Sequence, residues 1–500
     1  MNRLSSPLSH CVRPLGLSLL AVALAGCTLA PTYQRPASPV AAQWPIAPAA
    51  AGRANAASTA AVDLPWQDLF ADPKLRRIVQ LALDNNRDLR VAALNVEKAR
   101  AQYSIQRAEL IPQVGVNADG SAGRTPASVS STGVGGVGHA YYLDVGISAY
   151  ELDLFGRLRS LKAEALQSYL ATEETRRAAH ISLISQVASN YLSLAADLDL
   201  QKLAHETLRS RQEAYDLQTD LADAGNASQL ELRQAESELE NARAEALTTD
   251  NQVAANRNAL ELLVGAPLAA DLLPGSGALV GMLGVREIPA GLPSDLLHNR
   301  PDILAAEHTL VGANADIGAA RAAFFPSISL TGGLGRASDQ LSSLFDHGGR
   351  YWTFAPQISL PIFSGGRLKA QLEVSKVERD IAVAQYEQAI QTAFREVADA
   401  LAQRGVVDKQ LAAQRKRAEA AQAAYDLVQA RYDEGVASYL EVLDAQRTLY
   451  TAQQAHIQAE LSQQTSLVTL YKTLGGGWNG RTQALAELGG ATRDMSRQTQ

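Results

Sequence analysis

The sequence predicts an α+β membrane protein built from an internal duplication, and three observations carry this prediction. The chain of 500 residues begins with a short basic and apolar leader that ends at a cysteine. Two halves, offset by about 210 residues, then repeat the same succession of helix breaks. Each half combines strand-like alternation with a proline-free helical stretch far longer than the helices of ordinary globular domains.

The leader is the first element of the chain. It carries Arg3 and Arg13, and its apolar run 15–25 is too short for a bilayer core that needs about 20 residues, so it predicts an export signal. The run closes on Leu-Ala-Gly-Cys, which resembles the cleavage motif of lipoproteins and implies that Cys27 becomes the acylated N-terminus. The alternative is an ordinary signal with a cysteine at its end by chance. Thr28 follows, not the Asp that would commonly retain a lipoprotein in the inner membrane, so we expect the outer membrane.

Cysteine usage and charge exclude several classes of protein. Cys11 would leave with the leader and Cys27 would carry lipid, so the exported chain has no thiol for a disulfide or a cysteine-based metal site. Loss of Arg3 and Arg13 reduces 45 basic residues to 43 against 52 acidic ones, a net charge of −9 that argues against nucleic acid as a partner. No long apolar run follows the leader, so the chain would have to span an outer membrane as a closed β-barrel.

The duplication follows from matched breaks. Residues 85–114 and 299–328 both begin with an Asn/Arg/Asp cluster, continue as an Ala-rich helix and break at Pro112 or Pro326. Chance similarity between Ala-rich helices does not explain these shared breaks. The other matches are 154–157 with 362–367, and the turn at Gly225 and Ser228 with the turn at Gly435 and Ser438.

Each half contains two segments with period-two alternation, which is typical of lipid-facing barrel strands. Those of the first half include Val114 and Val116, then Leu143, Val145 and Ile147, with a change of parity near Tyr150 that predicts a bulge. Those of the second half are 327–331 and 352–360. A half-buried soluble sheet would give the same alternation in any one strand. We expect the Gly/Ser-rich stretches 125–139 and 337–350 to be exposed loops.

Four strands are too few to close a barrel, because the smallest closed membrane barrels have about eight. The strands must therefore be pooled between subunits. A dimer would give eight strands around an interior filled by side chains, whereas a trimer would give twelve and leave a lumen. If the protein forms a passage through the membrane, the trimer is therefore favoured.

Two helical stretches, 157–221 and 367–434, contain no proline, and Gly405 is the one glycine inside the second before the turn. At 1.5 Å per residue, about 65 residues extend to roughly 100 Å. Their apolar positions recur at three-four spacing, which indicates coiled-coil-like packing. These positions are Ile184, Val187, Tyr191, Leu194, Leu198, Ile390, Phe394, Val397 and Leu401. A filamentous coiled coil fits less well, because strands precede each helix and a sharp turn and a return helix follow it.

The chain resembles the TolC-like outer-membrane factors, most of all their lipoprotein branch, which serves tripartite RND pumps of Gram-negative bacteria. The resemblance extends from about residue 27 to residue 478. It rests on Tyr150-Glu151-Leu152-Asp153-Leu154-Phe155-Gly156, Arg300-Pro301-Asp302-Ile303, Phe324-Phe325-Pro326-Ser327-Ile328 and Leu474-Gly475-Gly476-Gly477-Trp478.

The resemblance implies a homotrimer whose twelve-stranded β-barrel, four strands per protomer, continues into a twelve-helix periplasmic α-barrel. It implies a passive exit duct for drugs or other small molecules, partnered by a periplasmic adaptor and an inner-membrane RND-type pump. The expected divisions are a signal peptide at 1–26, a lipidated equatorial segment at 27–73, repeats at 74–265 and 298–475, a linker at 266–297 and a tail at 476–500.

Two groups of residues are candidates for function. Glu441 and Asp444, three residues apart on one helix face, match the family positions whose carboxylates line the periplasmic constriction. Rings of three carboxylates would repel anions, attract cations and raise one another's pKa. The residues alone favour a solvated helix face, and the resemblance reverses that preference.

The second group is the two helix turns, where Gly225 and Gly435 let the chain leave a helix and Ser228 and Ser438 can cap the next one. By resemblance these tips meet the adaptor, and Arg431 adds a contact in the second repeat. A purely structural turn accounts for the same residues.

Two other kinds of function stay open, another export outlet and a structural lipoprotein. The outlet of a type I protein-secretion or heavy-metal efflux system would use the same architecture, and a structural coiled-coil lipoprotein would not conduct ions. We find no catalytic cluster, no ligand spacing among the eight histidines and no cofactor motif, so we expect neither an enzyme nor a metal site.

Overall fold

The computed structural model describes residues 28–45, 61, 63–131, 133–285, 287–289 and 291–477. The expected leader, Cys27 and the tail from residue 478 onward lie outside the described residues. The described chain divides into two compact units. The strand unit comprises the described residues within 28–37, 96–172 and 306–386, and the helical unit comprises those within 38–95, 173–305 and 387–477.

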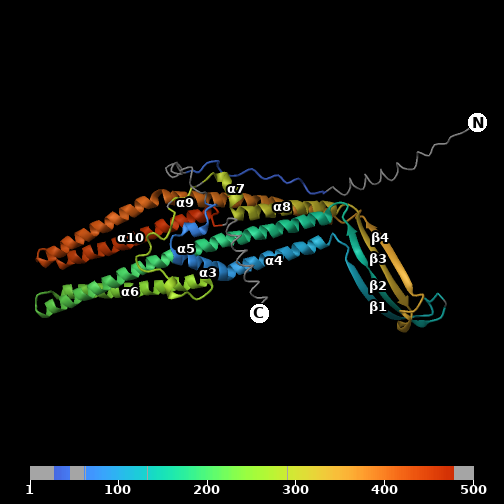
Figure 1. The fold of residues 1–500 in the computed structure, drawn as a ribbon, viewed down its shortest axis with the longest axis horizontal. Helices are drawn as coiled ribbons and strands as arrows, with labels where there is room; N and C mark the ends of the chain where they lie inside the picture. Colours follow the sequence, from blue (N-terminus) through green and yellow to red (C-terminus); the bar gives the residue numbers. More distant parts are fainter. Residues whose placement is uncertain are drawn as a thin grey trace, which may run out of the picture. The chain divides into compact units, whose positions relative to one another are not determined.

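The strand unit contains one antiparallel sheet in the order β1-β2-β3-β4 (Figure 1). Its strands are β1 (Val114–Thr125), β2 (Gly136–Leu152), β3 (Ser327–Ser338) and β4 (Arg350–Ser359). The expected loop at 125–139 was too long, because Gly136 and Gly138 pair with Thr125 and Gly123 and so extend the first hairpin. The other expected loop is shortened in the same way, since Arg350 pairs with Arg336.

The two faces of the sheet differ in chemistry. Along one row of cross-strand neighbours lie Val116, Val145, Leu334 and Trp352, whose side chains are between 49% and 72% exposed in the single chain. The next row is Asn117, Asp144, Gly335 and Tyr351, and Asp144 accepts hydrogen bonds from Asn117 Nδ2 at 3.1 Å and from the Tyr351 hydroxyl at 3.2 Å. The sheet therefore has an apolar face without cover and a polar, hydrogen-bonded face.

The expected bulge is present in β2. The pairing with β3 shifts between Ile147 and Tyr150, and Ala149 adopts a φ of 53°, the left-handed region that a non-glycine residue seldom enters. The Ala149 amide donates to Thr331 Oγ1 at 3.1 Å, which offsets the ladder bond lost at the bulge.

The N-terminal segment of the strand unit is bound along α8 (Pro301–Ala322). Arg321 donates to the Leu29 carbonyl at 3.1 Å and Asn314 donates to the Pro31 carbonyl at 2.7 Å. Arg35 makes a bidentate pair with Glu307, both contacts measuring 2.7 Å. The first described residues are thereby held at the end of α8 that leads into β3.

The helices repeat in matched lengths. α4 (Arg87–Ala108) and α8 each have 22 residues, and α5 (Arg157–Asp223) and α9 (Arg367–Asp433) each have 67. The return helices α6 (Gln229–Val264) and α10 (Tyr439–Thr473) have 36 and 35 residues. The predicted long helices are confirmed, and Gly405 lies inside α9 without interrupting it.

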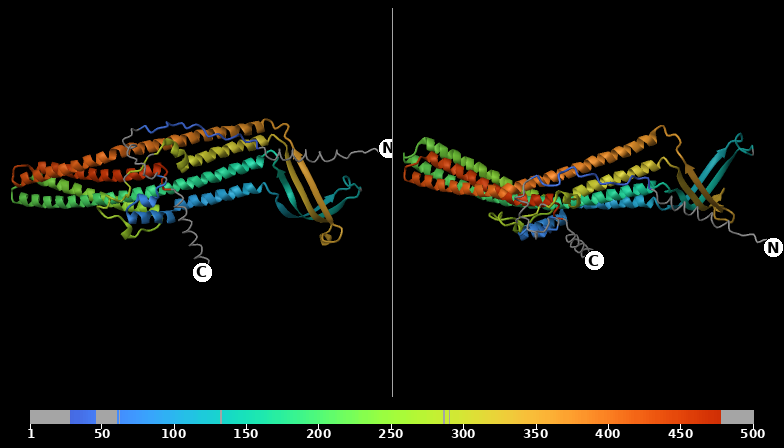
Figure 2. Two further views of the ribbon diagram at one scale, coloured as in Figure 1. Left: turned by 45° about the horizontal axis from the view of Figure 1, so that its top comes forward. Right: turned by 90° about the horizontal axis from the view of Figure 1, so that it is seen from above.

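The helical unit holds the hairpins α5/α6 and α9/α10, whose turns lie at the same end (Figures 1 and 2). At the other end of the hairpins lie α2 (Trp66–Leu69), α3 (Pro73–Asn85), α7 (Leu296–Asn299) and the short helices η2 (Ala270–Leu272) and η3 (Pro293–Asp295). Trp66, Leu69 and Phe70 are buried here, and Phe70 bridges to Leu283 of the linker between the repeats.

The described residues include no helix long and apolar enough to cross a membrane.

Candidate functional site

The turns of the two hairpins have the same backbone. After α5, the amides of Asn226 and Ala227 donate to the Leu221 carbonyl at 2.8 and 3.2 Å, and Gly225 has a φ of 76°. After α9, the amides of Val436 and Ala437 donate to the Arg431 carbonyl at 2.8 and 3.1 Å, and Gly435 has a φ of 73°. Glycine is favoured at both positions because a Cβ is strained in this conformation.

A serine and a glutamate begin each return helix together. Ser228 Oγ accepts from the Glu231 amide at 3.2 Å, and Glu231 Oε2 accepts from the Ser228 amide at 2.8 Å. Ser438 and Glu441 repeat the arrangement with distances of 3.3 and 3.2 Å. The capping role expected of both serines is confirmed. The glutamate partners were missed, although the Ser-x-x-Glu spacing shows them in the sequence.

Glu441 thus bonds to the start of its own helix. The hydrogen bonds from the backbone and side chain of Ser438 hold its pKa below the ordinary value, and the Arg431 guanidinium, 3.8 Å away, acts in the same direction. Arg431 and Glu441, expected in separate groups, therefore contact each other. The rise in pKa expected from a ring of carboxylates is a property of three copies and stays a prediction.

Asp444 lies one turn further along α10 and is exposed, as Glu441 is. On the other side of α10, Tyr439 and Leu443 are buried against Ala235 of α6. Tyr432 packs on Tyr439 with ring centroids 5.9 Å apart. The structure therefore places both candidate carboxylates on the open side of a helix that packs through its other side.

Among the residues that the structure describes, no group of three or more His, Cys, Asp or Glu side chains could hold a metal ion. The site offers exposed carboxylates, paired turns and a packed hairpin interface.

The comparison with known protein families decides the assignment. The family model described as "Outer membrane efflux protein" matches residues 78–266 and 292–476, one segment for each repeat. The chain belongs to the outer membrane efflux protein family. It is an outer-membrane channel subunit of an efflux system, and the expected recognition, function and location are confirmed.

Individual relatives cover nearly the whole chain. The toluene efflux pump outer membrane protein TtgC of Pseudomonas putida is 49% identical over 468 residues, covering 94% of this chain and 96% of the relative. The outer membrane protein OprJ of Pseudomonas aeruginosa is 45% identical, with coverage of 94% and 97%.

The fold agrees with solved channels. The open state of the MtrE outer membrane channel of Neisseria gonorrhoeae matches with a TM-score of 0.81 and 42% identity, covering 90% of this chain and 98% of that one. The CmeC outer membrane channel of Campylobacter jejuni matches with a TM-score of 0.85 at 27% identity. The predicted α+β channel class is therefore confirmed.

Proposed function

We propose that three copies of this chain close a passive duct through the outer membrane. The observation that carries the proposal is the sheet: within the described chain β1 and β4 pair on one side only, and β1 is exposed along its whole length. A strand edge without a partner is completed by a neighbouring strand, and an exposed apolar face is covered by lipid. Twelve strands from three copies satisfy both and leave a lumen.

The duplication supplies the expected contact between copies. Inside one chain, β2 pairs with β3 such that Glu151 faces Ser329, and beside that pair Phe155 stacks on Phe325 with ring centroids 4.7 Å apart. The matched strands in the other repeat are β4 and β1. We therefore expect Ser359 of one copy to face Gly115 of the next.

The same correspondence places Phe363 of one copy on Ile111 of the next. Both side chains are open in the single chain, with exposed fractions of 91% for Phe363 and 63% for Ile111. Burial of two such side chains against a second copy would remove apolar surface from water, which favours association.

The proposed cargo is drugs or other small molecules, such as organic solvents and antibiotics, because relatives at 45–49% identity include outer membrane proteins of pumps named for toluene and antibiotics. Under this proposal a periplasmic adaptor meets the turns at Gly225, Ser228, Arg431, Gly435 and Ser438, and an inner-membrane RND-type pump selects and drives the cargo. The duct itself catalyses no reaction.

We further propose that Cys27 carries the lipid anchor. The hydrogen bonds from α8 to Leu29 and Pro31 fix the chain directly after this residue, at the end of α8 that leads into β3. An acyl chain at Cys27 would then enter the membrane that the strands cross.

Conductance of the purified protein in a planar lipid bilayer tests the duct. We expect cation-selective pores, and Glu441→Ala with Asp444→Ala should raise the conductance and weaken the selectivity. The absence of any pore under all conditions would rule out the duct. An unchanged conductance in the double variant would remove both carboxylates as gate residues.

A further inference from the structure

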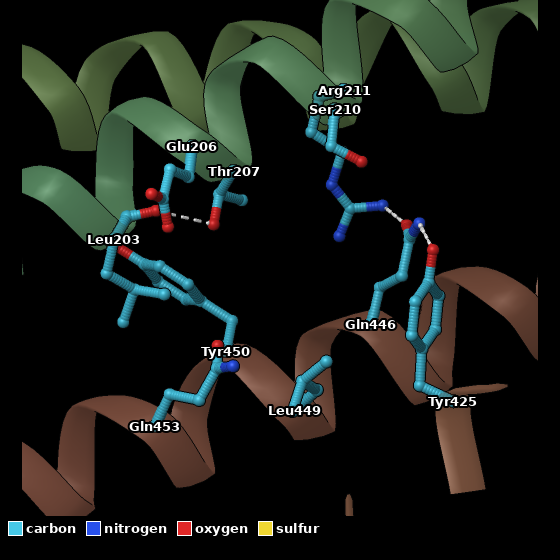
Figure 3. A pocket seen from close by; sticks show the side chains of 10 residues that line it. All are labelled: Leu203, Glu206, Thr207, Ser210, Arg211, Tyr425, Gln446, Leu449, Tyr450 and Gln453. Atoms are coloured by element: carbon cyan, nitrogen blue, oxygen red, sulfur yellow. Dashed lines mark hydrogen bonds between the residues drawn. The ribbon is translucent and has the colours of Figure 1, made fainter. Parts of the chain in front are cut away.

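A buried arginine joins the two hairpins of the helical unit. Arg211 of α5 has a side chain only 5% exposed, and its Nη1 donates to Oε1 of Gln446 on α10. Gln446 Nε2 in turn donates to the Tyr425 hydroxyl of α9 at 3.2 Å (Figure 3). Glu238 of α6 lies 3.8 Å from Arg211 Nη2 and 3.9 Å from Nε of Arg447. These five residues form what we call the Arg211 cluster.

The positive charges of the Arg211 cluster are incompletely neutralised. Two guanidinium groups share the carboxylate of Glu238, and neither approaches it at the distance of a good charge-assisted hydrogen bond. Burial is the largest influence on Arg211 and lowers its pKa, which Glu238 only partly offsets. A buried charge that is incompletely paired contributes little to the stability of the fold. Its main bond, to the neutral amide of Gln446, is one that a shift of α10 would break.

The cluster breaks the internal duplication. Tyr425 has a tyrosine, Tyr215, at the matched position of the first repeat. The position matched to Arg211, however, is Ala421, which is buried. Gln446 corresponds to Glu236, and Glu238 corresponds to Thr448, so these residue types are not repeated either. Only one of the two long helices therefore carries this cation, although the helices share their length and their turns.

An open-sided pocket of about 190 Å³ lies at the cluster, and Arg211, Tyr425 and Gln446 form part of its wall (Figure 3). It is lined from α5 by Leu203, Thr207 and Ser210 and from α10 by Leu449, Tyr450 and Gln453. Close-packed interiors resist displacement, because any movement creates clashes or voids. Open space along this boundary instead lets α10 move against α5 at lower cost.

We propose that Arg211 is a positioning residue for the constriction, through its bond to Gln446. Gln446 lies two residues beyond Asp444 and five beyond Glu441 on one unbroken helix. Together with the packing of Tyr439 and Leu443 on Ala235, the bond from Arg211 therefore limits how far the α9/α10 hairpin can move from the α5/α6 hairpin, and with it how far the carboxylates reach into the duct. This inference rests on the proposed function of Glu441 and Asp444.

Two substitutions of Gln446 should act in opposite directions. Gln446→Leu removes the acceptor and leaves the guanidinium with the distant Glu238, so the hairpins should separate more often. Gln446→Glu offers Arg211 a carboxylate, which forms stronger, bidentate bonds, so the hairpins should separate less often. Glu236→Leu, the matched change in the first repeat, is the control and should do neither.

The separation can be measured without relying on conductance. Spin labels on cysteines at Asn226 and Val436, both exposed at the two turns, report the distance between the hairpins in the full-length protein. The native cysteines both precede residue 28. Gln446→Leu should broaden the distance distribution and raise the open probability of the pore several-fold, whereas Gln446→Glu should narrow the distribution and lower the open probability. In an Arg211→Met background, Gln446→Leu should add no further change.

The possible results distinguish a failure of the role proposed for Arg211 from a failure of the proposed duct. If the Gln446 variants change the melting temperature but neither the distances nor the open probability, Arg211 is only structural and the inference is wrong. The same holds if Gln446→Leu keeps its full effect in the Arg211→Met background. If the parent protein forms no pore, the duct fails, while the distance distributions still decide whether Arg211 positions the hairpins.

Discussion

Ser438 and Glu441 bond to each other at the start of α10 as Ser228 and Glu231 do at the start of α6, so the two turns form a matched pair for experiment. If the constriction depends on the second repeat, Glu441→Ala should raise conductance and Glu231→Ala should not, although both remove the same cap. Planar bilayer recordings of the two variants check this. Equal effects would show that the change comes from the lost cap and not from a carboxylate in the duct.

The same cap has a defined dependence on pH. Because the pKa of Glu441 is depressed in the folded chain, its contribution to stability is complete above the ordinary value of 4.5 and is lost as the pH falls through the lower folded pKa. Ser438→Ala should cost about 1 kcal/mol of unfolding free energy near neutral pH. Chemical unfolding across pH should show that this cost shrinks only below 4.5. A cost that already disappears in the neutral range would contradict the assignment.

At the scale of elements, each return helix is followed within two residues by a glycine that lies against the start of its own repeat. A Cβ on Gly265 would lie 2.6 Å from the Asn85 carbonyl oxygen, and one on Gly475 would lie 2.6 Å from that of Asn299. Both glycines also have positive φ, 73° and 80°. Alanine at either position should therefore lower the unfolding free energy by more than about 1 kcal/mol.

Gly405 is the control for these two glycines. It lies inside α9, and apart from its chain neighbours and the nearby backbone of α9 itself, no atom of the described chain lies within 4 Å of the position of an added Cβ. Gly405→Ala should therefore stabilise the helix by about 0.5–1 kcal/mol. Thermal unfolding of the three variants gives the comparison, and similar losses at all three positions would refute the argument from close approach.

The elements were largely predictable from the sequence because their signals are local. Pro112 and Pro326 end helices before strands, and the absence of proline over 157–221 and 367–434 predicts the long helices within two residues. The hairpin connections were predicted too long, since glycines such as Gly136 lie inside strands whose pairing is fixed by the partner strand. No pattern in the sequence identifies Arg211 as buried, because its burial depends on three other helices that the fold brings together.

At the scale of the whole molecule, the sequence predicts the need for partners better than their number. Four strands cannot close a barrel, and this conclusion needs only their count. The choice of three copies rests on the requirement for a lumen and on the resemblance to known channels. The contact between copies is predicted in more detail than the number of copies, because the duplication assigns that contact residue by residue.

Disulfide cross-linking of Ile111→Cys with Phe363→Cys, in the intact protein in membranes, tests the closed trimer most directly. The control pair, Phe155→Cys with Phe325→Cys, lies within one chain and should give no linked copies. In a closed trimer, oxidation of the test pair should yield linked dimers and trimers, ending at three chains. A series that stops at two chains, continues beyond three, or fails to form would contradict the closed trimer.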